Sequence, residues 1–148
     1  MSGDAPTRQL VVFCLGDEEY ALPIADVNEI IRYTEPRSVA SSLGWIRGVI
    51  SLRGKIVPVY DLAARLGENR KPDRPPLKIV IVETGERMAG VIVDDVTEVL
   101  TIDCDSVEPV PPAAEPSIDS IARIEDRLIV LLSPAGLFGE GQAEAAAA

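Results

Sequence analysis

The chain has 148 residues, 47% of them hydrophobic, which is enough for a real core in one compact domain or two very small ones. Its 14 Lys and Arg against 24 Asp and Glu give a net charge of −10, so nucleic acid and anionic membranes are poor partners. Because there is no His and the only thiols are Cys14 and Cys104, zinc sites of His and Cys, Ser-His-Asp triads and Cys-His pairs are excluded.

Short apolar runs rich in Val and Ile predict β-strands along most of the chain. Tight links such as Gly16-Asp17-Glu18 and Arg53-Gly54 join neighbouring runs, which indicates antiparallel hairpins. The predicted strands cover residues 10–15, 45–52, 55–60, 78–82, 88–94, 99–102 and 127–132. The sequence therefore predicts a mainly β protein.

Few helices are predicted. Asp61 can cap a short helix over 62–66 that ends at Gly67. Ser133, with proline at the first helical position, opens another over 134–138, and a third is expected over 23–27. No window approaches the ~18 to 20 apolar residues of a membrane span, and the first nine residues are polar, so we expect a soluble, cytoplasmic protein without membrane insertion.

The sequence contains an internal duplication. A shift of 69 positions aligns 10–31 with 79–100 without a gap, so that DVNEII matches DVTEVL, and a shift of 72 aligns 55–68 with 127–140. The charged, proline-rich stretch 67–76 lies between the two copies and has the composition of a linker. Two β units of about 70 residues are therefore expected, with a groove between them that can bind a partner.

Charge is divided unevenly between the copies. Residues 10–78 contain 10 basic and 9 acidic residues, whereas 79–140 contain 3 basic and 13 acidic residues. Such a chain suits two protein partners of different charge better than one nucleic acid.

Support for catalysis is thin. Asp94 and Asp95 are adjacent, so a strand sends them to opposite faces, where they cannot form a close acid/base pair. Asp17-Glu18-Glu19 lacks the alternating ligands of a calcium loop, and no phosphate-loop spacing is present. We expect no enzyme activity, no catalytic residue, no metal site and no cofactor.

The LRGK segment has two interpretations. Gly54 permits the positive φ of a tight turn, which throws Arg53 outward at the tip between two apolar strands. Arg53 either keeps this hairpin soluble or contacts a partner, and the residues alone leave both open.

Four segments are informative in their order and spacing: NEIIR at 28–32, IRGVISLRGKIVPVYDL at 46–62, GVIVDDVTEVL at 90–100 and RLIVLLSPAGLF at 127–138. Together they resemble the CheW family of chemotaxis coupling proteins. The module also occurs in CheV proteins and as the regulatory domain of the kinase CheA. One departure is Ser51, where family members often carry Asn before LRG, which puts a side-chain hydrogen bond in doubt.

The resemblance implies two tandem SH3-like five-stranded β-barrels with a few short helices. It implies one CheW-like domain over 9–139, with subdomains at about 10–68 and 78–133, the helix 134–138 packing back on the first, and flexible tails at 1–8 and 140–148. It further implies a cytoplasmic adaptor, recruited to membrane-associated receptor arrays, that joins the tips of methyl-accepting chemoreceptors to the regulatory domain of CheA.

In the family, receptor tips dock along the groove between the barrels. Carried over position by position, this gives a receptor-binding set of Val27, Gly48, Arg53, Gly54 and Val99. The plainer alternatives are core packing for the two valines and backbone geometry for the two glycines. Alternative functions are coupling in another chemosensory-like pathway, such as type IV pili or second-messenger control, and binding of a small ligand in the groove.

Overall fold

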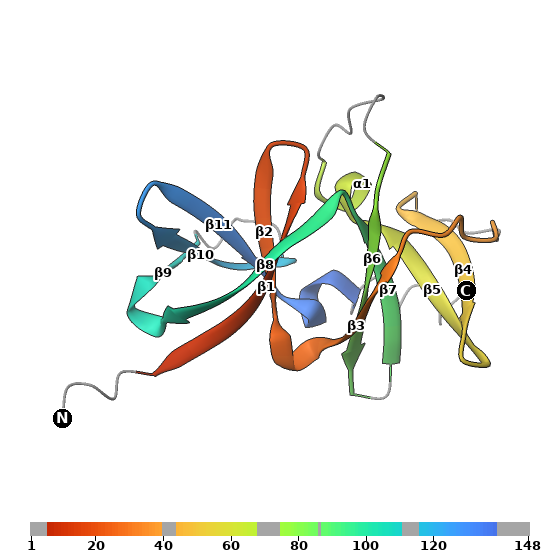
Figure 1. Ribbon diagram of the computed structural model, residues 1–148, viewed down its shortest axis with the longest axis horizontal. Coiled ribbons are helices and arrows are strands. Elements are labelled where there is room, and N and C mark those ends of the chain that lie inside the picture. The colour runs from red at the N-terminus through yellow and green to blue at the C-terminus, as the bar shows by residue number, and fades with distance from the viewer. Residues whose placement is uncertain (1–5, 40–43, 68–74, 86, 111–115, 139–148) are drawn as a thin grey trace.

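The computed structural model describes residues 6–39, 44–67, 75–85, 87–110 and 116–138. These residues form two β-sheets with a few short helices, which confirms the expected mainly β fold (Figure 1). The strands are β1 (Thr7–Leu15), β2 (Glu18–Pro23), β3 (Val27–Arg32), β4 (Ile46–Leu52), β5 (Lys55–Asp61), β6 (Lys78–Thr84), β7 (Arg87–Val93), β8 (Asp95–Asp103), β9 (Val107–Pro109), β10 (Ile118–Ile124) and β11 (Arg127–Leu132). The helices are α1 (Leu62–Leu66), the 3₁₀ turns η2 (Ile24–Asp26) and η3 (Cys104–Ser106), and a short helix at 134–138.

Two of the predicted helices form as their end signals indicate. The Asp61 carboxylate accepts a hydrogen bond from the Ala64 N–H at 3.2 Å, and Gly67 ends α1 at a φ of 75°. Ser133 opens the helix at 134–138, its carbonyl accepting from the Leu137 N–H at 2.9 Å. The third predicted helix, over 23–27, forms as the 3₁₀ turn η2, after which the chain extends into β3.

Each sheet draws its strands from both halves of the sequence. The six-stranded sheet has the order β8-β1-β2-β11-β10-β9, and the five-stranded sheet has the order β3-β6-β7-β5-β4. The expected division into 10–68 and 78–133 is therefore not the boundary between the sheets. The stretch 67–76 leads from α1 to β6 within one sheet, rather than from one unit to the other, and its residues 68–74 lie outside the described residues.

The duplication is nevertheless visible strand by strand. The repeat alignment matches β1 with β6, β2 with β7 and β3 with β8, while β4 and β5 correspond to β10 and β11. Replacing each strand of β3-β6-β7-β5-β4 by its counterpart gives β8-β1-β2-β11-β10, which is the order of the other sheet. Each sheet thus combines the first two strands of one copy with the later strands of the other, three in the five-stranded sheet and four in the six-stranded sheet, where β9 is added at the edge.

The exchange follows from two short crossings between the sheets. η2 carries the chain from β2 to β3, and Asp94 alone carries it from β7 to β8. The Asp94 carboxylate accepts from the Gly16 N–H at 2.7 Å, its N–H donates to the Cys14 carbonyl at 3.1 Å, and its carbonyl accepts from the Leu77 N–H at 2.9 Å. Asp94 therefore ties the β1–β2 turn to the start of β6.

The period-two alternation of the strands fills three apolar clusters. On β6, Ile79 and Ile81 face a cluster within the five-stranded sheet, while Val80 and Val82 face a cluster between the sheets. β1 does the same in the six-stranded sheet, so both faces of these strands are buried. The central cluster also receives Phe138, whose ring centroid lies 5.1 Å from that of Tyr60.

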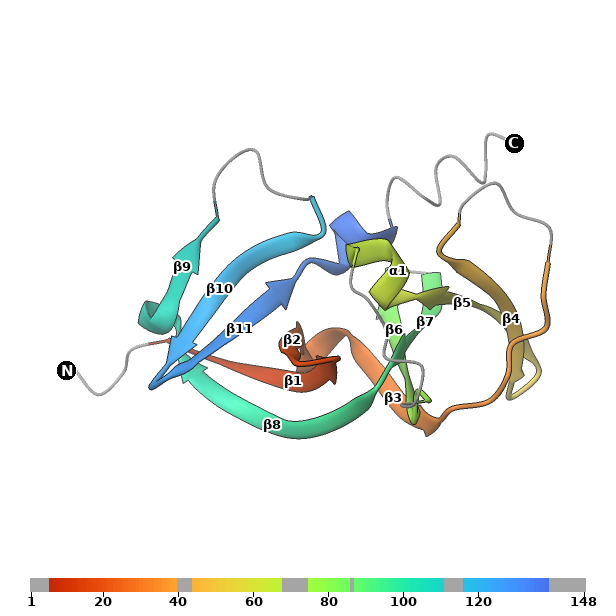
Figure 2. The ribbon, with the colours of Figure 1, turned by 90° about the horizontal axis from the view of Figure 1, so that it is seen from above.

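The helix at 134–138 lies between the two sheets in both views of the ribbon (Figures 1 and 2). Its Leu137 and Phe138 belong to the same apolar cluster as Tyr60, Leu62 and Ala63 of the first copy. Of the expected tails, Thr7 and Arg8 belong to β1, and residues 140–148 lie outside the described part of the chain.

A backbone bridge closes the five-stranded sheet on itself. The Arg37 N–H donates to the Val49 carbonyl at 2.8 Å, and the Val49 N–H donates to the Arg37 carbonyl at 2.9 Å. The segment after β3 is thereby joined to β4, the opposite edge of the sheet. Gly48 permits this approach, because a Cβ there would lie 2.0 Å from the Arg37 carbonyl oxygen and its φ is 151°.

Candidate protein-interaction site

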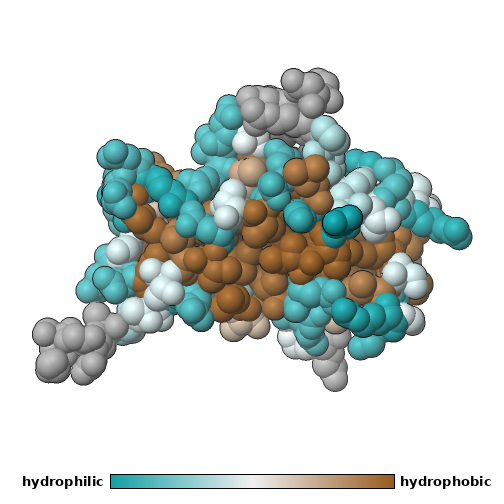
Figure 3. Space-filling view, viewed as in Figure 1, coloured by the Kyte–Doolittle hydropathy of each residue, from teal (hydrophilic) through white to brown (hydrophobic). Residues whose placement is uncertain are grey.

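The outer strands β8 and β3 lie along the same long side of the molecule, one on each sheet (Figures 1 and 2). The space-filling view of this side shows an apolar band across both sheets (Figure 3). On β8, β3 and the preceding turn η2, three large apolar side chains are exposed. They are Val99 of β8, Ile30 of β3 and Ile24 of η2, with exposed fractions of 54%, 39% and 37%. We call these three residues the apolar face, and exposed patches of this kind commonly mark protein-interaction sites.

The duplication builds this face twice. Ile30 and Val99 are counterparts in the repeat. Ile30 pairs with Val80 on β6 and Val99 pairs with Val11 on β1, and Val80 and Val11 are also counterparts. Both strands also carry a register shift at counterpart positions, around Asn28 on β3 and around Thr97 on β8. Such bulges twist an edge strand and re-aim its side chains.

The hairpin between β4 and β5 places Arg53 and Gly54 at its tip. Both have positive φ, 52° and 81°, as a two-residue turn of the favoured hairpin type requires. The Arg53 side chain is 72% exposed and forms an ion pair with the Glu29 carboxylate of β3. The hydrogen bond that Arg53 donates to Glu29 raises the pKa of Arg53, so the arginine stays charged and spans the two edges of the five-stranded sheet.

The five residues expected to bind a receptor have different surroundings. Val99, Arg53 and Gly54 are exposed, and nothing lies within 4 Å of a Cβ built on Gly54. Val27 is half-buried and packs against the cluster between the sheets, and Gly48 is buried. Arg53 contacts β3, the strand that carries Val27, through its ion pair with Glu29, two residues after Val27. Val99 lies on the other sheet.

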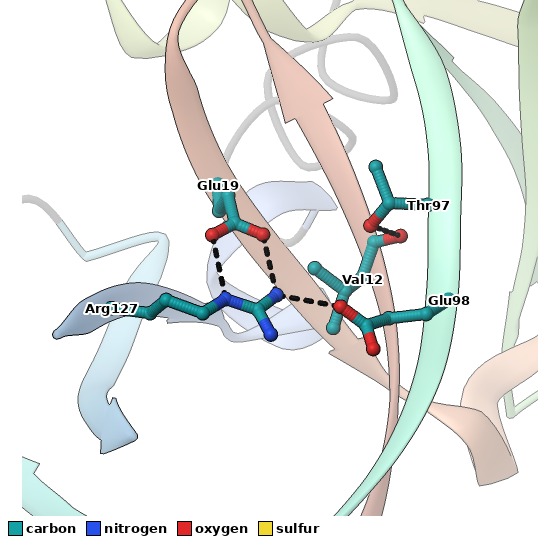
Figure 4. A network of polar contacts seen from close by, with 5 residues as sticks. All are labelled: Val12, Glu19, Thr97, Glu98 and Arg127. Carbon is teal, nitrogen blue, oxygen red and sulfur yellow. Dashed lines mark hydrogen bonds and ion pairs between the residues drawn. The ribbon is translucent and has the colours of Figure 1, made fainter. Parts of the chain in front are cut away.

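A second arginine site, which the sequence analysis did not single out, holds β8 in place (Figure 4). Arg127 of β11 donates to both carboxylate oxygens of Glu19 on β2, at 3.1 and 2.7 Å, and to Glu98 of β8 at 2.6 Å. Next to it, the Thr97 hydroxyl donates to the Val12 carbonyl at 3.1 Å. The hydrogen bond from Arg127 lowers the pKa of the Glu19 carboxyl group. The network fixes the edge strand that carries Val99.

A signal for both arginine contacts was present in the sequence. The repeat alignment matches Glu29 with Glu98, and each of these carboxylates accepts an arginine in the structure, Arg53 and Arg127 respectively. The arginines themselves are not counterparts, because Arg53 corresponds to Glu125 in the other hairpin. Only the folded structure therefore identifies the partners.

We expect Arg127→Met to lower the free energy of unfolding by about 1 kcal/mol at neutral pH, measured by urea denaturation. The effect is modest because the Arg127 and Glu19 side chains remain 35% and 28% exposed, so solvent screens the pair. Since the pKa of Glu19 is lowered on folding, this contribution is present above its ordinary value of 4.5 and is lost as the pH falls through the lowered pKa. Wild type and variant should therefore converge at acidic pH, once the pH lies below the lowered pKa.

The control for Arg127 is Arg123 on β10, which forms a more exposed ion pair with Glu108, with exposed fractions of 60% and 55%. Arg123→Met should leave the unfolding curve unchanged at both pH values. An Arg127 variant as stable as wild type at neutral pH would show that the network does not hold β8.

Two further observations bear on the kind of site. Across the parts of the chain that the structure describes, no group of three or more His, Cys, Asp or Glu is placed to hold a metal ion. None of the helices formed by those residues is long and apolar enough to cross a membrane.

The charge asymmetry follows the sheets. In the described residues of the six-stranded part, 6–23, 95–110 and 116–138, there are 3 basic and 11 acidic residues. The described residues between 24 and 94 contain 8 basic and 6 acidic residues. A partner that docks along the apolar face therefore meets a basic end and an acidic end.

Comparisons with known proteins agree with this architecture. Residues 9–142 match the model of the CheW-like domain. The chain is 33% identical over 145 residues to Chemotaxis protein CheW of Rhizobium meliloti, covering 94% of this chain and 92% of that protein, and 31% identical over 125 residues to Protein PilI of Pseudomonas aeruginosa, covering 80% and 68%. The crystal structure of the scaffolding protein TtCheW from Thermoanaerobacter tengcongensis superposes with a TM-score of 0.83 at 37% identity, covering 90% of this chain and 93% of that one. The chain belongs to the CheW-like domain family.

Proposed function

We propose that this chain is a non-enzymatic adaptor that couples methyl-accepting chemoreceptors to the histidine kinase CheA in the cytoplasm, at membrane-associated receptor arrays. The observation that carries the proposal is its membership of the CheW-like family over nearly its whole length, with relatives named as a chemotaxis protein and a scaffolding protein. The exposed apolar face on the two outer strands supports a role in binding proteins.

In this proposal the receptor tip docks along the apolar face, and Val27, Gly48, Arg53, Gly54 and Val99 form its binding site. Val99 and Arg53 make direct contact, because their side chains are exposed. Gly54 supplies the positive φ of the hairpin tip, Gly48 lets the sheet close, and Val27 supports β3 from within. The regulatory domain of CheA binds elsewhere, at the ends of the barrels.

A second candidate is coupling in another chemosensory-like pathway, such as control of type IV pili or of a second messenger. The similarity to Protein PilI, at 31% identity, favours keeping this candidate. The two candidates use the same adaptor chemistry and differ only in the receptor and kinase that the chain joins.

The test of the adaptor function is a three-component capture. Immobilised CheA is expected to retain a receptor cytoplasmic fragment when this chain is added, and not without it. Repeating the capture with the receptor and kinase of a pili-type system distinguishes the two pathways. If the chain binds neither a receptor fragment nor a CheA-type kinase, the adaptor function is wrong.

We expect Val99→Asp to weaken binding to the receptor fragment by at least about tenfold, because it places a charge in the centre of an apolar contact. Isothermal calorimetry with the purified fragment measures the change. Leu128→Asp is the matched control, since Leu128 lies in the same sheet with an exposed fraction of 53% against 54% for Val99. Equal loss in both variants would mean that any exposed apolar residue matters, and no loss in Val99→Asp would remove β8 from the site.

A further inference from the structure

Two shallow recesses lie at counterpart positions of the duplicated fold. One is lined by residues at the start of β6, the end of β3 and the start of β8, namely Arg32, Tyr33, Pro76, Leu77, Lys78 and Asp95. The other is lined by residues at the start of β1, around η2 and near the end of β8, namely Thr7, Arg8, Gln9, Pro23, Ile24, Ala25 and Thr101. The repeat shift of 69 positions maps Thr101 onto Arg32 and Gln9 onto Lys78.

The two recesses differ in charge at one cross-strand pair. Arg32 of β3 is directly opposite Lys78 of β6, and Thr101 of β8 is directly opposite Gln9 of β1. Directly opposed residues of an antiparallel pair place their side chains on the same face, where two like charges destabilise the sheet. The five-stranded sheet therefore carries a repulsive pair at a position where the other sheet has two neutral side chains.

Nothing that the structure describes neutralises this pair. Among the described residues, neither Arg32 nor Lys78 has an acidic side chain within ion-pair distance, although Asp95 lines the same recess. The Asp95 carboxylate instead accepts from the Val96 N–H at 2.9 Å. By contrast, Arg53 and Arg127 each have a carboxylate partner. Arg32 and Lys78 thus have no carboxylate partner among the described residues, which leaves them able to bind an anion.

The pair continues the apolar face. Ile30 and Arg32 are two residues apart on β3 and both are exposed, so they lie on the same face of the strand. A segment that packs on Ile30 therefore reaches Arg32 and Lys78 as its next contact. Two adjacent cations at the end of an apolar surface are complementary to a carboxylate.

We propose that Arg32 and Lys78 form a seat for an acidic side chain of the protein that docks on the apolar face, and that this seat fixes the direction in which the partner lies. The inference rests on the proposed receptor binding and deepens it, because it names a charge that the docking segment must carry. The counterpart pair of Gln9 and Thr101 provides no such seat, so the two ends of the face are not equivalent for a partner.

The double variant R32T/K78Q tests the seat by installing the pair that the other sheet already accepts. Its thermal midpoint should equal or exceed that of wild type, because the like-charge repulsion is removed. Binding to the receptor cytoplasmic fragment, measured by calorimetry, should weaken by at least about tenfold, and its dependence on NaCl concentration should become shallower.

Arg37→Gln is the matched control. Arg37 is also an exposed arginine without an ion pair among the described residues, but it is joined to β4, the opposite edge of the sheet. Its substitution should change neither the affinity nor the salt dependence.

Unchanged affinity of R32T/K78Q, with wild type binding, would overturn the seat and leave the adaptor function intact. The pair would then serve only to keep an edge strand soluble. If inorganic phosphate raises the thermal midpoint of wild type but not of R32T/K78Q while receptor binding is unchanged, the recess binds a small anion and the proposal is wrong. If wild type itself fails to bind the receptor fragment, both the adaptor function and the seat fail.

Discussion

Gly48→Ala is expected to lower the free energy of unfolding by about 3 kcal/mol or more, the largest effect of a single methyl group that we expect in this chain. The added Cβ would lie 2.0 Å from the Arg37 carbonyl oxygen, far inside contact distance. Because that atom belongs to the backbone, the chain itself must move. The movement breaks the two hydrogen bonds between Arg37 and Val49 that close the five-stranded sheet.

Urea denaturation followed by circular dichroism measures the loss at Gly48. The control is Gly44→Ala, since a Cβ on Gly44 meets nothing within 4 Å and Gly44 has no positive φ. That change should leave stability within about 0.5 kcal/mol of wild type. If Gly48→Ala were equally harmless, the closure of the sheet by Arg37 would be refuted.

Binding measurements separate the two interpretations of Gly48 itself. If Gly48 supports the site by letting the sheet close, a variant weakens receptor binding only as far as it unfolds or distorts the sheet. A fully folded Gly48→Ala protein that fails to bind the receptor fragment would instead point to direct contact at this position.

Arg53→Glu is expected to weaken binding to the receptor fragment by at least about tenfold while the fold stays intact. The substitution removes an exposed cation and places a carboxylate beside that of Glu29, so both the direct contact and the charge of this edge are reversed. The turn itself tolerates Glu, because Glu125 occupies the counterpart position of the other hairpin with a φ of 54°, close to the 52° of Arg53.

The measurement for Arg53 is a paired one. The thermal midpoint should remain close to that of wild type, and capture by CheA should be much less affected than capture by the receptor fragment. Arg53→Gln, which removes the charge without reversing it, should have an intermediate effect. Arg123→Glu, a reversal at an exposed arginine of the other sheet, serves as the control. Equal loss of both partners in Arg53→Glu would contradict separate surfaces, and an unfolded variant would make Arg53 a structural residue.

Local chemistry in the sequence determined the elements of this protein. Alternating apolar residues marked most of the strands, Asp61 and Gly67 marked the ends of α1, and the matched Gly16 and Gly85 take φ values of 62° and 61° in counterpart turns. The resemblance to the CheW family likewise came from short sequence segments, which can be recognised without knowing which residues they contact in the fold. Strands β2, β3, β9 and β10 were not predicted, because charged and polar residues interrupt their apolar runs.

Tertiary structure alone decided which strands lie together. Period-two alternation specifies which face of a strand is buried, but it does not specify the neighbouring strand. Because the two copies have similar strand patterns, a strand can pair equally well with a strand of its own copy or of the other copy. The chain crosses to the other sheet at η2 and at Asp94, so β3 and β8 pair with strands of the other copy.

The same long-range pairing created the site. Arg53 meets Glu29 and Arg127 meets Glu98 only because the sheets bring together residues that are 24 and 29 positions apart. Arg32 and Lys78, 46 positions apart, become opposed only when β3 pairs with β6. Position 48 has no room for a Cβ because closure of the sheet brings the Arg37 carbonyl against it. Local geometry was therefore encoded near each residue, whereas charge partners and close contacts arose when the sheets brought together strands that are distant in the sequence.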